Sequence, residues 1–269
     1  MATLIYLMLW FGFIALTYFI VQPALFSVAF FVILFGGVVV YFALTLLIFA
    51  LSLEVYGRLF KGVYTESRAH HRFVDSYMRL VIRLLRLKLT VTGLENVPDK
   101  PFILVANHQA NYDTVIHKAL LPSPFVFIAK HKLFTWPILG GAARALGNIP
   151  MYRENDRSAV EAIIKGINVY KSGVSVGIYP EGTRSHGHKM LPFKAGALKL
   201  ATKPKAPILV GVIDGSYNTW KHWPFLSQRI YLHFFPLLEP QSYESMSSSE
   251  LSEHIRSMIQ EKLNEFNQK

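Results

Sequence analysis

The sequence contains no cysteine, and its first 53 residues contain no Asp, Glu, Lys, Arg or His. The absence of cysteine excludes disulfide bonds, a catalytic thiol and cysteine-ligated metal, and it fits a reducing compartment. Every charged side chain lies in residues 54–269, where Lys and Arg outnumber Asp and Glu by 28 to 17. This charged part is long enough for one domain of ordinary size with a full core.

The uncharged start consists of two apolar stretches, residues 1–21 and 24–53, separated by Gln22 and Pro23. About 20 apolar helical residues span a bilayer, so each stretch is long enough. A cleaved signal peptide would need a basic start and a small-residue cleavage site, and neither is present. We therefore expect residues 1–53 to form a two-helix membrane-anchoring hairpin that either crosses the bilayer or dips into it. The positive-inside rule then predicts membrane localisation with residues 54–269 on the cytoplasmic face.

Residues 54–86 are expected to form an amphipathic basic connecting helix. On a helix with 3.6 residues per turn, arginines cluster in one sector and apolar side chains lie opposite. The arginines are 68, 72, 79, 83 and 86, and the apolar residues are Val74, Tyr77, Val81, Leu84 and Leu85. Such a stripe is usually a solvated face. Beside a membrane anchor, contact with anionic headgroups is the alternative, and nucleic acid is not expected as a partner.

Residues 87–269 alternate short apolar runs with helical periodicities, which predicts an α/β domain with a mixed, mainly parallel sheet flanked by helices. The capping box Ser247/Glu250 precedes an apolar stripe of helical spacing in the C-terminal segment. The expected strands are residues 87–93, 102–107, 125–129, 174–180, 207–213 and 229–235, and the expected helices are residues 114–121, 136–147, 157–171 and 196–201.

The stretch "NHQANYD" at residues 107–113 is the first candidate site. Five helical steps turn a side chain by 500°, so His108 and Asp113 do not share a face of a regular helix. A turn from a strand into a helix opened by Asp113 would bring them together at the carboxyl end of the strand, where α/β sheets hold their sites. An imidazole held by a carboxylate is a general base. The alternative is that Asp113 only caps the helix and His108 is a loop histidine.

The stretch "YPEGTRSHGHKMLPFKAGA" at residues 179–197 is the second candidate site. Arg184 offers a planar fork of donors suited to a phosphate, Lys194 offers a compact cation, and Thr183 adds a hydroxyl. Gly182 forces a turn after a strand, and Glu181 would hold an arginine or accept a bond from a substrate hydroxyl. Alone, this stretch also fits a surface turn with ordinary charges.

Together, the two stretches resemble the signatures of the glycerolipid acyltransferases. "NHQANYD" carries the pattern N-H-x-x-x-x-D, and "YPEGTRS" followed by "FKAGA" resembles the second signature. "GNIPMYR" resembles the block between them, and "TGLENVP" resembles the usual lead-in. The resemblance covers roughly residues 87–215, in the order and spacing of that family. It is strongest to the members that acylate lysophosphatidic acid, 1-acyl-sn-glycerol 3-phosphate.

The resemblance implies direct acyl transfer from acyl-CoA or an acyl carrier protein to the free sn-2 hydroxyl of lysophosphatidic acid, giving phosphatidic acid. His108 would take the hydroxyl proton and Asp113 would hold its ring. It implies no acyl-enzyme, and we expect no metal and no cofactor beyond the donor. The implied substrate-binding residues are Lys130, Arg153, Glu181, Gly182, Thr183, Arg184 and Lys194, with Lys130 placed near the developing oxyanion.

Two departures from the family pattern concern the acceptor. Tyr152 precedes Arg153 where an acidic residue is common, and Gly211 lies near the place of a second proline in the last block. An acyltransferase for another lyso-lipid is therefore the first alternative. A second alternative is a lipid-binding protein that keeps the fold without turnover.

The remaining alternatives are a serine hydrolase and a metal enzyme. "GVSVG" at residues 173–177 places Ser175 in a G-x-S-x-G pattern, but the sequence predicts that a strand continues where that motif requires a helix. His70, His71 and "HGH" at residues 186–188 lack the spacing of zinc ligands, and we expect surface or interfacial histidines.

Overall fold

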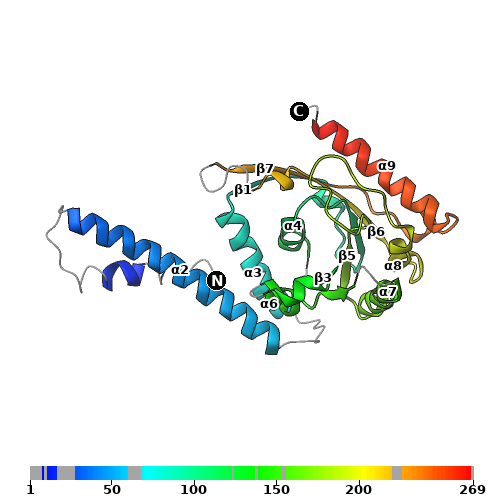
Figure 1. The fold of residues 1–269 in the computed structure, drawn as a ribbon. Helices are drawn as coiled ribbons and strands as arrows, with labels where there is room; N and C mark the ends of the chain where they lie inside the picture. Colours follow the sequence, from blue (N-terminus) through cyan, green and yellow to red (C-terminus); the bar gives the residue numbers. More distant parts are fainter. Residues whose placement is uncertain are drawn as a thin grey trace.

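The structure is a computed structural model that describes residues 8, 11–16, 28–59, 68–122, 124–136, 139–152, 156–219 and 226–267. It consists of an α/β body with one long helix, α2, that extends away from it (Figure 1). The C-terminal helix α9 lies on the other side of the body in the same view.

A seven-stranded sheet forms the centre of the described body, in the order β1-β7-β6-β2-β5-β3-β4. Only the β6–β7 pair is antiparallel among the pairs within the described residues. The predicted mixed, mainly parallel sheet is therefore confirmed. The strands are β1 Leu87–Thr92, β2 Ile103–Ala106, β3 Phe125–Lys130, β4 Ile149–Met151, β5 Ser175–Ile178, β6 Ile208–Asp214 and β7 Gln228–Phe234.

Helices lie on both faces of this sheet, so the central strands are buried at every position. The strands β2, β5 and β6 show no exposed residue, which explains why they appear in the sequence as continuous apolar runs rather than as alternating patterns. The helices are α2 Val28–Leu59, α3 Arg68–Leu84, α4 Tyr112–Leu120, α5 Lys132–Thr135, α6 Leu139–Ala145, α7 Asp156–Lys171, α8 Lys199–Thr202 and α9 Ser248–Asn267.

Two apolar clusters divide between the faces of the sheet. One contains residues of α7, α8 and α9 packed on β2, β5 and β6, including Val105, Ala162 and Ile255. The other contains residues of α4 and of the segment after α3, packed on side chains of β2, β3, β6 and β7, including Leu104 and Ile116. The alternation of Leu104 and Val105 between the clusters is the two-residue period of a strand with both faces covered.

The C-terminal helix begins with the predicted capping box. The Ser247 N–H donates to Glu250 Oε2 at 2.7 Å, and the Glu250 N–H donates to Ser247 Oγ at 3.2 Å. These bonds lower the pKa of the exposed Glu250 carboxyl. The apolar stripe of α9 is fully buried at Leu251, Ile255, Ile259 and Leu263. Both features were predicted by the sequence pattern.

The expected membrane hairpin is not confirmed. Most of its first arm lies outside the described residues, and α2 runs from Val28 to Leu59, beyond the expected end of the hairpin at residue 53. Within the part of the chain that the structure describes, no helix combines the length and the apolarity that crossing a bilayer requires. The side chains of α2 are nevertheless largely apolar and exposed, with Val28 at 80% and Phe35 at 73%.

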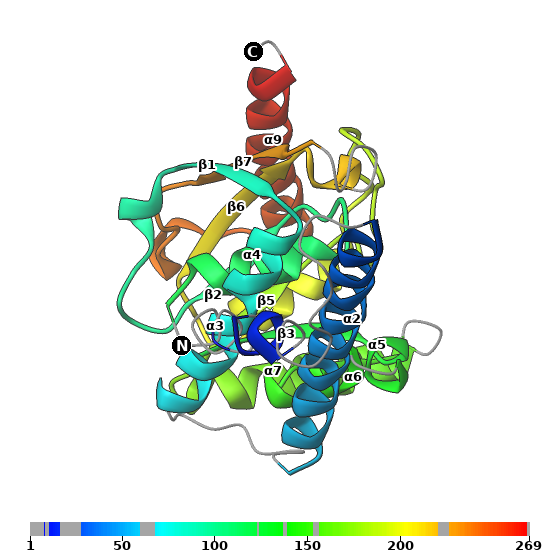
Figure 2. The same ribbon diagram turned by 90° about the vertical axis from the view of Figure 1, so that its left-hand side faces the viewer.

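The C-terminal half of α2 packs against α6, beside which it runs in Figure 2. The helices approach closely at Gly141, where a Cβ atom would lie 2.3 Å from Glu54 Cα. Arg144 Nη2 donates to Glu54 Oε1 across the same contact. Close backbone approach therefore requires glycine at position 141.

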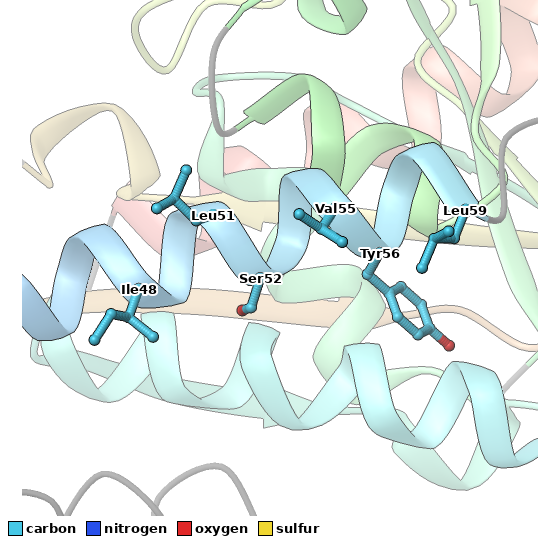
Figure 3. Close-up of a pocket in the computed structure, with 6 residues that line it drawn as sticks. All are labelled: Ile48, Leu51, Ser52, Val55, Tyr56 and Leu59. Carbon is cyan, nitrogen blue, oxygen red and sulfur yellow. The ribbon is translucent and has the colours of Figure 1, made fainter.

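A shallow apolar hollow lies along the C-terminal half of α2 (Figure 3). Its lining comes from α2 alone, so it contains none of the sequence-predicted site residues. The lining residues are Ile48, Leu51, Ser52, Val55, Tyr56 and Leu59.

The helix α3 has the predicted basic face. Arg72, Arg79 and Arg83 are exposed, and Val74 on the opposite side is fully buried. This helix packs against α4 through a buried group in which Lys118 Nζ lies 3.3 Å from Asp75 Oδ1. A charged side chain inside this interface is compensated by its partner, as burial requires.

Candidate active site

The turn between β2 and α4 brings His108 and Asp113 together. His108 Nδ1 lies 2.8 Å from Asp113 Oδ2, and Asp113 is fully buried. The same oxygen accepts the backbone N–H groups of Gln109 at 2.6 Å and Ala110 at 2.9 Å. The turn therefore curls around one carboxylate oxygen, which is why residues five positions apart meet. Asp113 lies in the first turn of α4, and the capping residue is Asn111, two positions before the Asp113 that the sequence predicted to open the helix.

Asn107 fastens this turn to the neighbouring strand β6. Its side-chain amide donates to the carbonyl oxygen of Ile213 at 2.8 Å and accepts the N–H of the same residue at 2.9 Å. Asn107 is 1% exposed. A residue that bonds both backbone groups of one partner defines the position of the turn relative to the sheet, because neither bond is replaced by water at this depth.

Glu181 connects the His108 turn to the loop that follows β5. Its Oε1 accepts the His108 N–H at 2.7 Å, and its Oε2 accepts the Leu191 N–H at 2.8 Å. The loop makes a further bond from the Ser185 N–H to the His108 carbonyl oxygen at 2.8 Å. Burial raises the pKa of the Glu181 carboxyl, and its bonds from Leu191 and His108 act in the opposite direction. In this structure both carboxylate oxygens of Glu181 therefore serve to position backbone.

An aromatic wall lies behind His108. The Tyr179 ring stacks on the His108 ring with a centroid separation of 4.2 Å and an interplanar angle of 8°. The Tyr179 hydroxyl lies 3.1 Å from His117 Nδ1, which is also 2.8 Å from the Asp113 carbonyl oxygen. Burial lowers the pKa of His117 to about 4 and raises that of Tyr179 well above its ordinary value. Both groups are therefore neutral at physiological pH.

The other predicted site residues with described positions lie on the loop after β5 or at the end of β3. Gly182 adopts φ 69°, and a Cβ there would lie 3.2 Å from Lys194 Cε, so the Lys194 side chain crosses the turn. Thr183 is exposed and Arg184 is partly buried, on the loop that is bonded to the His108 turn. Lys130 is exposed at the end of β3, which β5 separates from β2.

Arg153 lies outside the described residues, so its position relative to the dyad is not described. Its neighbour Tyr152 is 51% exposed and stacks on His131 with the ring centroids 3.9 Å apart. Gly211 lies in the buried strand β6, where a Cβ would contact Leu104 Cδ1 at 3.2 Å. This departure from the family pattern therefore faces the core.

Ser175 does not have the surroundings of a nucleophile. It is the first residue of β5, at the end of the strand remote from Glu181, and it is 5% exposed. Its Oγ accepts the backbone N–H of Phe102 at 3.2 Å. Because a strand follows Ser175 and no helix does, the G-x-S-x-G pattern lacks the strand–turn–helix context of a nucleophile elbow.

The histidines differ in burial and in bonding partners more than the sequence pattern indicated. His71 is 2% exposed and bonds Lys118 Nζ, so it is a buried residue of the α3–α4 interface and not a surface histidine. His188 pairs with Asp214, with its Nδ1 2.8 Å from Oδ1. No group of three or more acidic or imidazole side chains suited to a metal ion is found among the described residues.

Tyr179, Gln109, Asp214 and His188 belong to the surroundings of the dyad, and the sequence reasoning did not select them. Tyr179 is the first residue of the second signature, and Gln109 lies inside the first, so position within the signatures was the available signal for these two. Asp214 and His188 are 26 residues apart in the chain, and only the fold brings them together.

The arrangement is suited to proton transfer. Because His108 Nδ1 is bonded to a carboxylate, Nε2 is the ring nitrogen that can accept a proton from a ligand. The buried Asp113 carboxylate stabilises the imidazolium that results. A cationic loop with Arg184 and Lys194 adjoins this base, which favours an anionic ligand.

Comparisons with known proteins give consistent matches. Residues 88–213 match the family described as Acyltransferase. The 1-acyl-sn-glycerol-3-phosphate acyltransferase of Borreliella burgdorferi is 34% identical over 189 residues, which cover 69% of this chain and 76% of that protein. The chloroplastic 1-acyl-sn-glycerol-3-phosphate acyltransferase of Brassica napus is 33% identical over 168 residues, or 62% of this chain, and the match spans only 48% of that longer protein.

Among solved structures, the crystal structure of the 1-acyl-sn-glycerophosphate acyltransferase of Thermotoga maritima superposes with a TM-score of 0.65 at 26% identity. The superposition covers 82% of this chain and 98% of that one.

Proposed function

The chain belongs to the family of the 1-acyl-sn-glycerol-3-phosphate acyltransferases, and from this membership we propose that His108 and Asp113 catalyse its reaction. The protein transfers an acyl chain to the sn-2 hydroxyl of 1-acyl-sn-glycerol 3-phosphate and forms phosphatidic acid. The observation that carries the catalytic assignment is the 2.8 Å contact of His108 Nδ1 with the buried Asp113 carboxylate.

His108 acts as the general base. Its Nδ1–H donates to Asp113 Oδ2, which fixes the tautomer with an unprotonated Nε2. The acceptor hydroxyl gives its proton to Nε2 while its oxygen attacks. Asp113 and the stacked Tyr179 ring keep the imidazole in one orientation during this step.

The transfer itself is a direct displacement at the acyl thioester. The acceptor oxygen forms a bond to the thioester carbonyl carbon, and the resulting tetrahedral oxyanion collapses with cleavage of the C–S bond. The thiolate leaves and takes the proton that His108 has held, so the base is regenerated. The donor is acyl-CoA or an acyl carrier protein, and Lys130 at the end of β3 is assigned to the oxyanion.

The acceptor phosphate is bound by the loop after β5. Arg184 supplies a bidentate donor, while Lys194 adds a second charge where it crosses Gly182. Thr183 orients the acceptor, and Arg153 contributes a further cation. Glu181 acts in this scheme through its two backbone bonds, because these place the His108 turn beside the phosphate-binding loop.

The protein works at a membrane, with its catalytic domain on the cytoplasmic face. The exposed apolar side chains of α2 exceed what an isolated soluble helix normally presents to water, and such surfaces mark contacts with membranes or partners. The uncharged residues 1–53 form the anchoring hairpin in this proposal. The exposed arginines of α3, including Arg79, then lie near anionic headgroups, where each contributes about 1 kcal/mol.

The experiment is a thiol-release assay on the purified full chain in detergent, with palmitoyl-CoA and lysophosphatidic acid. We expect acceptor-dependent release by the wild type and a loss of about 10²–10⁴-fold in kcat for His108→Ala, because general-base assistance contributes that much. His186→Ala is the matched control, since His186 is exposed on the same loop as Arg184.

Three other outcomes would change the proposal. Near-normal turnover of the His108→Ala variant removes the general-base assignment. Release with other lyso-lipids but not with lysophosphatidic acid reassigns the acceptor. Lipid binding that is unaffected by His108→Ala, with no transfer from acyl-CoA or acyl carrier protein, would indicate a binding protein.

A further inference from the structure

The loop between β5 and the helical segment at residues 195–198 is fastened in two places. Its neck is closed by Glu181, whose two oxygens bond the N–H groups of His108 and Leu191. The Ser185 N–H adds a bond to the carbonyl oxygen of His108. These neck contacts fix the catalytic turn, but they leave the residues between Ser185 and Leu191 to be placed by other contacts.

The tip of the loop is fastened by His188. Its Nδ1 lies 2.8 Å from Asp214 Oδ1 at the carboxyl end of β6, and its Nε2 bonds the Tyr217 hydroxyl. Both ring nitrogens are therefore engaged, and the imidazole joins the tip of the loop to the last residue of β6 and to Tyr217 beyond it. The Ser185 hydroxyl donates to the Gly187 carbonyl oxygen at 2.9 Å, which closes the loop on itself.

Asp214 is the fixed end of this contact. It is 5% exposed, whereas the His188 side chain is 44% exposed. Asp214 Oδ1 also accepts a bond from Gln109 Nε2 at 2.9 Å. This buried carboxylate bonds one residue of the catalytic turn and one residue of the loop, so it fixes the positions of the two segments relative to each other.

We propose that His188 is a positioning residue for acceptor binding: through Asp214 it fixes the tip of the loop, residues 186–190, and so limits the motion of the adjoining Arg184, whose guanidinium is presented to the acceptor phosphate. This inference rests on the proposed assignment of Arg184. The neck contacts of Glu181 do not involve His188. The contacts that place the His108 turn are therefore separate from the contacts that place the tip of the loop. Loss of the His188 contact leaves the His108 turn in place and releases residues 186–190, which directly follow Arg184 and Ser185 in the chain.

The test compares three variants of the full chain. His188→Ala removes both bonds of the imidazole. His188→Asn keeps an amide donor near the place of Nδ1 and is the conservative variant. His186→Ala is the matched control, because His186 is an exposed histidine of the same loop and makes no such pair with Asp214 within the described residues.

For His188→Ala we expect the KM for lysophosphatidic acid to rise about tenfold, as for the loss of a hydrogen bond to a charged group. The kcat and the KM for acyl-CoA should stay within about twofold. His188→Asn should recover most of the acceptor KM, and His186→Ala should match the wild type. Equal effects on both KM values, a loss of kcat alone, or the same result for His186→Ala would overturn the inference.

A binding measurement separates this inference from the proposed reaction. Affinities for lysophosphatidic acid and for 1-monoacylglycerol, which lacks the phosphate, are measured with the enzyme in detergent without a donor. His188→Ala should weaken only the phosphate-bearing lipid. If His188→Ala weakens the binding of both lipids equally, the positioning role is overturned. If the wild type shows no turnover but His188→Ala still weakens only the phosphate-bearing lipid, the proposed reaction is overturned and the positioning role stands.

Discussion

At the scale of single residues, the His108 ring is held by contacts from three directions. Asp113 bonds its Nδ1, Glu181 bonds its backbone N–H, and the Tyr179 ring covers one of its faces. The contacts with Asp113 and Glu181 fix the position of His108. The stacked Tyr179 ring restricts rotation of the imidazole about the bond that joins it to Cβ. Stacking of this kind contributes about 0.5–1.5 kcal/mol beyond the area that it buries.

Substitution of Tyr179 separates its ring from its hydroxyl. Tyr179→Phe removes the bond to His117 and keeps the stack, so kcat should stay within about threefold of the wild type. Tyr179→Leu removes both, and kcat should fall by about tenfold relative to the Phe variant, because the imidazole samples unproductive orientations. The measurement is the steady-state rate at saturating donor and acceptor.

The KM values provide the control for this prediction. A ring that positions only the base should leave the KM for the acceptor unchanged in both variants. Equal kcat values for the Phe and Leu variants would show that the stack does not assist His108.

The sequence was sufficient to predict the dyad but not its supports. The spacing of His108 and Asp113, with a strand before and a helix after, allowed their meeting in a turn, and the resemblance to the glycerolipid acyltransferases selected that reading over a simple helix cap. The partners of Glu181 were not predictable, because a carboxylate that accepts two backbone N–H groups leaves no side-chain pattern. The pairing of His188 with Asp214 depends on β5 and β6 lying on either side of β2, which no local pattern specifies.

At the scale of elements, α4 carries a buried histidine into the aromatic wall behind the dyad. His117 is fully buried beside Phe127, Tyr179 and Phe234. Burial lowers its pKa to about 4, against the opposing effect of Asp113. Since the ordinary value is about 6.5, the unfolded chain binds this proton more readily than the folded chain between these two values.

The stability of the fold should therefore fall as the pH decreases from about 6.5 towards about 4. At neutral pH His117 is largely unprotonated in both the folded and the unfolded state, so its protonation does not lower the free energy of unfolding there. Between pH 7 and pH 5 the wild type should lose about 2 kcal/mol more free energy of unfolding than His117→Asn. That variant keeps an amide near Nδ1 and does not titrate. Denaturant unfolding at the two pH values measures the difference, and equal losses in both proteins would contradict the assigned cause.

The sequence predicted six of the seven described strands and the longer helices of the body with small errors at their ends, but it did not predict the short strand β4 or the short helix α5. Periodicity located α7 and α9, and apolar runs located β2, β5 and β6, because helices cover both faces of the sheet. The order of the strands was not predictable, since β2, β5 and β6 are equally apolar and differ only in their tertiary neighbours. The antiparallel return of β7 onto β6 is set by the connection between them.

At the scale of the whole molecule, the described part of α2 joins the body mainly at α6, and Tyr56 also packs on the apolar cluster that contains Val74 of α3. Its N-terminal half extends beyond the body with exposed apolar side chains (Figure 1), and its C-terminal half packs on α6 at Gly141. The ion pair of Glu54 and Arg144 lies at the same contact. If α2 attaches to the bilayer as proposed, this contact determines how the site at the end of β2 faces the lipid surface.

Gly141→Ala should therefore uncouple attachment from catalysis. The new methyl group would lie 2.3 Å from Glu54 Cα, so α2 has to move away from α6, at a cost of about 1–3 kcal/mol. Gly36→Ala is the matched control, since Gly36 is a helical glycine of α2 with open space around its Cβ position.

The measured quantity is the ratio of two initial rates: the rate with lysophosphatidic acid in phospholipid vesicles, divided by the rate with a short-chain acceptor dispersed in detergent. The Gly141 variant should lower this ratio severalfold and keep the rate in detergent, because the His108 turn does not contact α2 in the described structure. An unchanged ratio would mean that the orientation of the body at the membrane does not depend on the α2–α6 contact.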